Sequence, residues 1–122
     1  MPNAFDTYAA LRAHALTLPG AWEDYPWGER VMKVGKKVFI FMGRESELEA
    51  GLGFAVKLPT SGAELLTRPY AEPTGYGLGK SGWVSLRYPP EASPDLAEIR
   101  AWTEESWAAI APKRAVNAFL KR

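Results

Sequence analysis

Two helical patterns with strand patterns between them most constrain what this sequence can fold into. Apolar side chains recur at helical spacing over residues 5–15 and again over residues 96–110. Between them, runs such as "RVMKV" and "VFIFM" are rich in β-branched and aromatic residues and are bounded by glycine or proline. This order predicts an α+β fold, a two-layer sandwich in which the N- and C-terminal helices pack on one face of an antiparallel sheet.

Local signals place several elements within this scheme. "AWEDYPWG" predicts an edge strand, because Pro26 cannot donate a hydrogen bond to a central ladder. Gly35-Lys36 predicts a hairpin turn, and Ser93 is expected to cap the last long helix. "RPYAEP" shows no strand pattern. The predicted core contains Leu11, Val56, Leu86, Ile99, Trp107 and Ile110.

Length and composition narrow the functional classes. A chain of 122 residues predicts one domain over residues 1–122. The sequence contains no cysteine, which excludes thiolate metal sites and cysteine nucleophiles and favours a cytoplasmic location. No apolar run is long enough to span a membrane. The net charge of +1 is too small to indicate a nucleic-acid partner. Any electrostatic argument for such a partner must rest on where the charges lie.

A glycine-rich stretch, "TGYGLGKSGW", ends like a nucleotide-binding phosphate loop. The signature requires a glycine five residues before Gly79, where this chain has Thr74. A phosphate loop must also open a helix, whereas the following "WVSLRY" has a strand pattern. The stretch therefore predicts a turn that leads into a strand.

Alternation along the strands predicts what lies on the sheet face without helices. If Val84 and Leu86 face the core, Trp83 and Arg87 face the other way. Cations from neighbouring strands and turns are expected around the tryptophan. The candidate residues for nucleic-acid binding are Lys33, Lys36, Lys37, Lys57, Lys80, Trp83 and Arg87. Aromatic rings can stack on bases while cations hold phosphates, but lysines on an exposed sheet also simply maintain solubility.

No catalytic constellation emerges from the remaining polar residues. His14, the only histidine, lies on a helix with a structural pattern. Glu45, Glu47 and Glu49 lack the Asp/Gly spacing of a calcium loop. No serine occupies a nucleophile-elbow motif. The sequence thus predicts a protein that is not an enzyme, without a cofactor or a metal site.

The chain resembles the MmcQ/YjbR family of small bacterial proteins from the first helix to about Lys113. The resemblance rests on "PWG", "VKLP" and "YGLGKSGWV" in this order, and on Ser106-Trp107 in the last long helix. It implies a frataxin-like or double-wing fold and a DNA-binding role. The family's recurring positions correspond here to Trp27, Gly28, Lys33, Lys57, Gly77, Lys80 and Trp83. Iron binding of the frataxin type does not carry over, because Asp6 is the only acid of the first helix.

These observations favour a monomeric binding module whose ligand is nucleic acid. Two alternatives stay open. The first is a protein-interaction module in which Trp27 and Trp83 anchor a partner. The second is a small-molecule-binding protein with a pocket near the glycine-rich stretch. The salt dependence of binding separates the first two, because phosphate contacts are strongly salt-dependent and an apolar interface is not.

Overall fold

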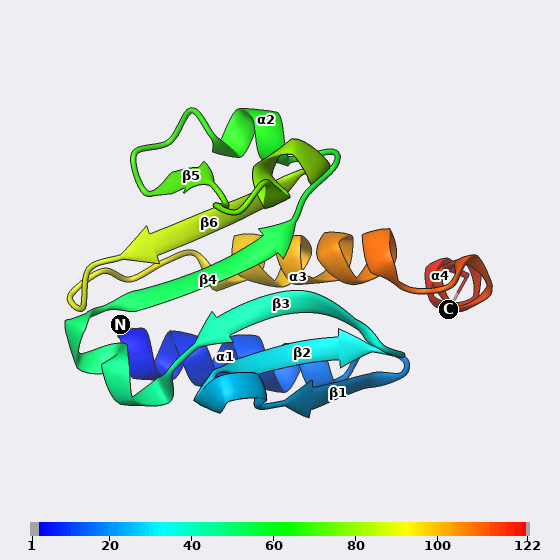
Figure 1. The fold of residues 1–122 in the computed structure, drawn as a ribbon, viewed down its shortest axis with the longest axis horizontal. Helices are drawn as coiled ribbons and strands as arrows, with labels where there is room; N and C mark the ends of the chain where they lie inside the picture. Colours follow the sequence, from blue (N-terminus) through cyan, green and yellow to red (C-terminus); the bar gives the residue numbers. More distant parts are fainter. Residues whose placement is uncertain (1–2, 122) are drawn as a thin grey trace.

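The computed structural model describes residues 3–121, and these form a two-layer α+β sandwich (Figure 1). Six antiparallel strands make one sheet in the order β1-β2-β3-β4-β6-β5. The strands are β1 (Ala21–Asp24), β2 (Arg30–Val34), β3 (Lys37–Gly43), β4 (Leu52–Lys57), β5 (Ala71–Pro73) and β6 (Trp83–Tyr88). The helices are α1 (Ala4–Leu16), α2 (Gly62–Leu65), α3 (Leu96–Ile110) and α4 (Lys113–Leu120), with 3-10 turns η1 (Pro26–Gly28), η2 (Glu45–Ala50) and η3 (Leu78–Ser81).

Helices α1 and α3 lie side by side on the same face of the sheet, as predicted (Figure 1). Asn3 caps α1 through a reciprocal pair of hydrogen bonds with Asp6. Of the predicted core residues, Ile110 is only partly buried and the other five are fully buried. The opposite face carries no long helix and is called the open face below. No helix within residues 3–121 combines the length and apolarity needed to cross a membrane.

A bulge explains why β3 is apolar at successive positions. The register between β2 and β3 shifts after Met32, so that Ile40 pairs with Met32 but Val38 pairs with Lys33. Phe39 is the extra residue, and both Phe39 and Ile40 join the main core. Phe41 then faces the open side, where it pairs with Ala55 of β4.

Two local predictions are wrong. The segment "RPYAEP" contains the short edge strand β5, which pairs with β6 from Ala71 to Pro73. Proline is tolerated there because nothing pairs with the outer side of an edge strand. The N-cap of α3 is Asp95 rather than Ser93, since the Asp95 carboxylate accepts hydrogen bonds from the Ala97 and Glu98 amides.

Candidate functional site

The tryptophan at the centre of the predicted site lies on the open face but is not exposed. Only 7% of Trp83 is accessible, and its ring contacts Phe41 with the centroids 5.2 Å apart. Buried Val31 and Ala55 lie on the same side, apart from the main core. The expected accessible stacking platform at Trp83 is therefore wrong: alternation chose the correct face, but neighbouring side chains cover the ring.

The glycine-rich stretch is a turn, as predicted, and it leads through η3 into β6. Gly77 has φ of 78°, a conformation that favours glycine. Gly79 is required for another reason, because a Cβ there would lie 2.9 Å from the Pro73 Cβ. The backbone amides therefore do not gather at the start of an α-helix, as a phosphate loop would require.

Lys33 is engaged within the protein. Its ammonium donates a hydrogen bond of 2.8 Å to Asp24 and lies 5.2 Å from the centroid of the Trp22 ring. This hydrogen bond lowers the pKa of the Asp24 carboxyl. Both partners are on β1, where Trp22 pairs directly with Lys33. A phosphate would have to compete with a carboxylate already in place.

Arg87 is also separated from the other candidates. It lies at the far end of β6, opposite Gly53 of β4, and its Nε donates a hydrogen bond of 3.1 Å to Glu72. The structure thus divides the seven predicted residues: Trp83 is covered, Lys33 is paired, and Arg87 lies at the other end of the sheet.

The remaining four candidates gather at one end of the sheet. Lys36 and Lys37 lie in the β2–β3 hairpin, and Lys57 ends β4. Lys80 lies in η3, just before Trp83, which pairs with Lys57. Within residues 3–121 none of these four lysines has a carboxylate partner.

The Ser106 hydroxyl of α3 holds this end together. It accepts a hydrogen bond of 2.8 Å from the Lys57 amide and donates one of 2.5 Å to the Phe39 carbonyl. The pairs found between β3 and β4 are Ile40–Val56 and Phe41–Ala55, so the hydroxyl bridges the strands where their ladder has stopped. A buried side chain thereby replaces backbone pairing and fixes the end of β4 relative to the hairpin strand.

Helix α4 continues the same end of the molecule (Figure 1). Phe119 packs on Trp107 with the centroids 5.1 Å apart, and the Trp107 indole donates a hydrogen bond of 3.0 Å to the Pro19 carbonyl. Pro19 lies just before β1, whose first residue Ala21 pairs with Val34 beside the hairpin. These contacts bring the exposed Lys113, Arg114 and Lys121 to the end that carries the four lysines.

The four lysines and the three cations of α4 are together called the basic end. It comprises Lys36, Lys37, Lys57, Lys80, Lys113, Arg114 and Lys121. In the described part of the chain, every other lysine and arginine except Arg100 forms an ion pair. These pairs are Arg12–Glu23, Arg30–Glu23, Arg30–Glu45, Lys33–Asp24, Arg44–Glu29, Arg44–Glu47, Arg68–Glu64, Arg68–Glu98 and Arg87–Glu72.

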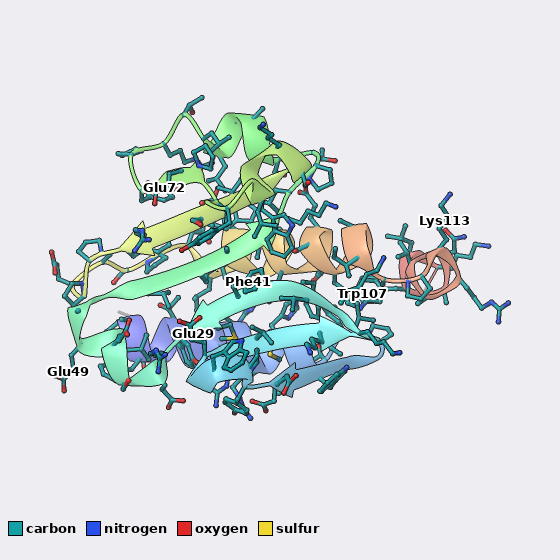
Figure 2. All side chains as sticks on the ribbon, viewed as in Figure 1. Glu29, Phe41, Glu49, Glu72, Trp107 and Lys113 are labelled. Atoms are coloured by element: carbon teal, nitrogen blue, oxygen red, sulfur yellow. The ribbon has the colours of Figure 1, made fainter. Side chains whose placement is uncertain are left out.

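Acidic side chains are not confined to the opposite end, since the Glu105 carboxylate accepts hydrogen bonds from the Thr60 and Ser61 amides, shortly after Lys57. Figure 2 shows Glu49 and Lys113 at opposite extremes of the molecule. Among residues 3–121, no three metal-ligating side chains come together as a cation site. In the described residues, most of the cations without an ion pair thus lie at one end, although the chain is nearly neutral as a whole.

Comparison with known families fits this arrangement of elements. The YjbR family model matches residues 16–109, from the end of α1 to the last turn of α3. The chain belongs to the YjbR family. The match includes the strands, the glycine-rich turn and Ser106, whereas α4 lies beyond it. No curated protein matches the chain.

Family membership confirms the resemblance drawn from the sequence, but it assigns no activity. The YjbR segment contains the four lysines of the basic end that the sequence predicted, while the three cations of α4 were missed as functional candidates. A signal for two of them was present, since "KR" follows Pro112 directly at the start of the helical pattern. Trp27 lies in η1 and is exposed over 92% of its surface, in contrast to the buried Trp83.

Proposed function

We propose that this protein is a non-enzymatic binding module that binds nucleic acid, DNA included, weakly through its basic end. The observation that carries the proposal is the clustering of cations without carboxylate partners at one end, while nearly all others are paired. Unpaired cations are free to replace the counterions that surround nucleic-acid phosphates.

The start of α4 supports the same proposal. Lys113 and Arg114 occupy its first turn, no acid lies there, and no side chain caps its N-terminus. Cations at a helix N-terminus oppose the helix dipole and do not stabilise the helix. The same arrangement concentrates positive potential and free amide donors, which suits an anion brought to this end.

Binding of this kind reads phosphates and carries little sequence information. With Trp83 covered, base stacking on that ring is not part of the proposal. We expect a dissociation constant on the order of 10⁻⁴–10⁻⁶ M at physiological salt. Four phosphate contacts give a log–log salt slope of roughly −3 to −4.

The test is a fluorescence anisotropy titration of a labelled DNA oligomer at several salt concentrations. Lys57→Ala should flatten the salt slope by about one unit or less. Lys33→Ala is the matched control, because it removes the same charge from the same sheet face at a paired position. The slope should be unchanged in the control. Absence of saturable binding by wild type at low salt would refute the proposal and leave the protein-interaction module as the next hypothesis.

A further inference from the structure

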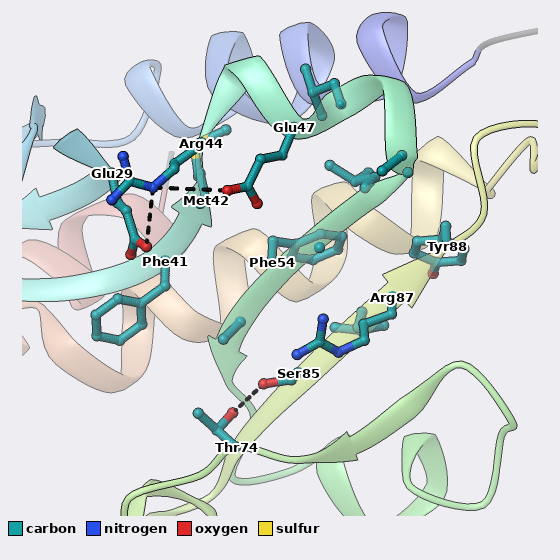
Figure 3. A pocket seen from close by; sticks show the side chains of 18 of the residues that line it. Glu29, Phe41, Met42, Arg44, Glu47, Phe54, Thr74, Ser85, Arg87 and Tyr88 are labelled. Atoms are coloured by element: carbon teal, nitrogen blue, oxygen red, sulfur yellow. Dashed lines mark hydrogen bonds and ion pairs between the residues drawn. The ribbon is translucent and has the colours of Figure 1, made fainter.

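A groove is hollowed into the open face and extends from η2 to the glycine-rich turn (Figure 3). Its volume is about 760 Å³, within the range of small-molecule sites. The end of β3 and η2 bound it on one side, and β6 with the glycine-rich turn bounds it on the other. The groove uses none of the residues of the basic end.

The floor of the groove is formed by residues with small side chains or none. Gly53 and Ala55 of β4 form it, with Phe41 and Ser85 flanking Ala55 on the neighbouring strands. A Cβ added at Gly53 would meet nothing closer than the Leu86 carbonyl oxygen at 3.8 Å. Backbone strain does not require glycine at this position, so the missing side chain serves to leave space. A flat apolar body can lie over this floor.

Two arginines and two glutamates are the charged residues that line the groove. Arg87 is 77% exposed, and Glu72 binds its Nε while the residues described offer no partner to its terminal nitrogens. Arg44 lies in a different wall, with its Nε 3.8 Å from both Glu29 and Glu47, beyond hydrogen-bond distance. Figure 3 shows the Arg87 guanidinium directed toward Ser85 along the groove. An anionic group can therefore accept hydrogen bonds end-on from Arg87.

An exposed, strained aromatic residue stands at the mouth. Tyr76 is fully exposed with φ of 57°, an uncommon conformation for a bulky residue. Gly75 and Gly77 flank it, and a Cβ at either would meet no atom within 4 Å. Backbone strain of this kind concentrates at ligand sites. The Tyr76 ring thus stands in open space at the edge of the groove.

We propose that this groove binds a small molecule with a flat apolar body and one carboxylate or phosphate group. The body lies over Gly53 and Ala55 beside Phe41, and the anionic group binds Arg87. This site is separate from the basic end, so its failure and the failure of the nucleic-acid proposal are distinguishable.

Three probes test the proposal: naphthoate, naphthyl phosphate and the neutral naphthalenemethanol. Each is titrated into the isotope-labelled full chain while amide chemical shifts are recorded. At least one anionic probe should saturate and shift Gly53, Ser85 and the amides of residues 74–78. The two anionic probes tell a carboxylate ligand from a phosphate ligand. Shifts centred on the basic end instead would overturn the proposal.

Two variants separate the apolar body from the charge. Gly53→Val fills the floor and should weaken binding of all probes about tenfold or more. Arg87→Gln should weaken only the anionic probes, by about ten- to a hundredfold. Arg100→Gln is the matched control, an exposed arginine on α3 outside the groove, and should bind as wild type does. Unchanged binding in Gly53→Val, with the fold verified by its melting temperature, would overturn the site. Equal losses in Arg87→Gln and Arg100→Gln would overturn the role of Arg87.

Discussion

The two ends of the sheet use cations in opposite ways. At the end with the β2–β3 hairpin, Lys36, Lys37, Lys57 and Lys80 lack carboxylate partners. At the other end Arg87 forms an ion pair beside a groove, as Arg44 does across it. The two ends therefore differ in whether their cations have carboxylate partners, as well as in how many cations they carry. In the account proposed here, the lack of carboxylate partners is what lets the basic end attract a polyanion.

The largest effect is expected from the residue that joins α4 to the sheet. Trp107 is fully buried, packs on Phe119 and donates a hydrogen bond to the Pro19 carbonyl. Trp107→Ala should lower the free energy of unfolding by about 3–5 kcal/mol. Urea denaturation followed by circular dichroism measures this loss. A cost below about 1 kcal/mol would mean that this contact does not hold α4 against the sheet. The cations of α4 could then not be counted as part of the basic end.

Truncating the covered tryptophan should cost stability and leave DNA binding intact. Trp83→Ala removes a buried ring that packs on Phe41, so we expect a loss of about 3 kcal/mol in the free energy of unfolding. At a temperature where the variant is folded, its affinity for a DNA oligomer should match that of wild type. A base-stacking residue would instead lose about 1–3 kcal/mol of binding free energy. Such a loss would mean that Trp83 does contact the bound DNA.

Removing the Ser106 hydroxyl should have a smaller effect on the same end. Ser106→Ala leaves the Lys57 amide and the Phe39 carbonyl without this partner, which should cost about 1–3 kcal/mol of unfolding free energy. Amide hydrogen exchange of Lys57 should accelerate more than that of residues near the groove. Ser46→Ala, at an exposed position, is the control and should change neither quantity. Unaltered exchange at Lys57 would mean that the hydroxyl does not hold the strands.

Local patterns in the sequence were enough to predict most of the fold. Gly35-Lys36 joins adjacent strands, so the hairpin depends on neighbouring residues alone. The edge strand β5 was missed because it has only three residues and one of them is Pro73. These residues adopt a strand conformation by pairing with β6, which a local pattern does not reveal. Alternation placed Trp83 on the open face, but it does not reveal what covers a side chain.

The candidate site was harder to predict because it depends on register and on long-range contacts. Lys33 is engaged because Trp22 pairs with it and Asp24 reaches its ammonium, which requires the β1–β2 register. The cations of α4 join the basic end through long-range contacts such as the one between Trp107 and Phe119. Gly53 was a sign of the groove that the sequence did contain. Glycine weakens a strand, so its presence inside one often marks a place where another group comes close to the backbone.

The central claim is that the basic end, and not the groove end, binds nucleic-acid phosphates. Two double variants test it directly, because each removes two positive charges: Lys57→Ala with Lys80→Ala, and Arg44→Ala with Arg87→Ala. The measurement is the log–log salt slope of DNA binding for both variants and for wild type. We predict a slope flatter by about one to two units for the lysine variant and unchanged for the arginine variant. A flatter slope in the arginine variant alone, or equal flattening in both, would contradict the account.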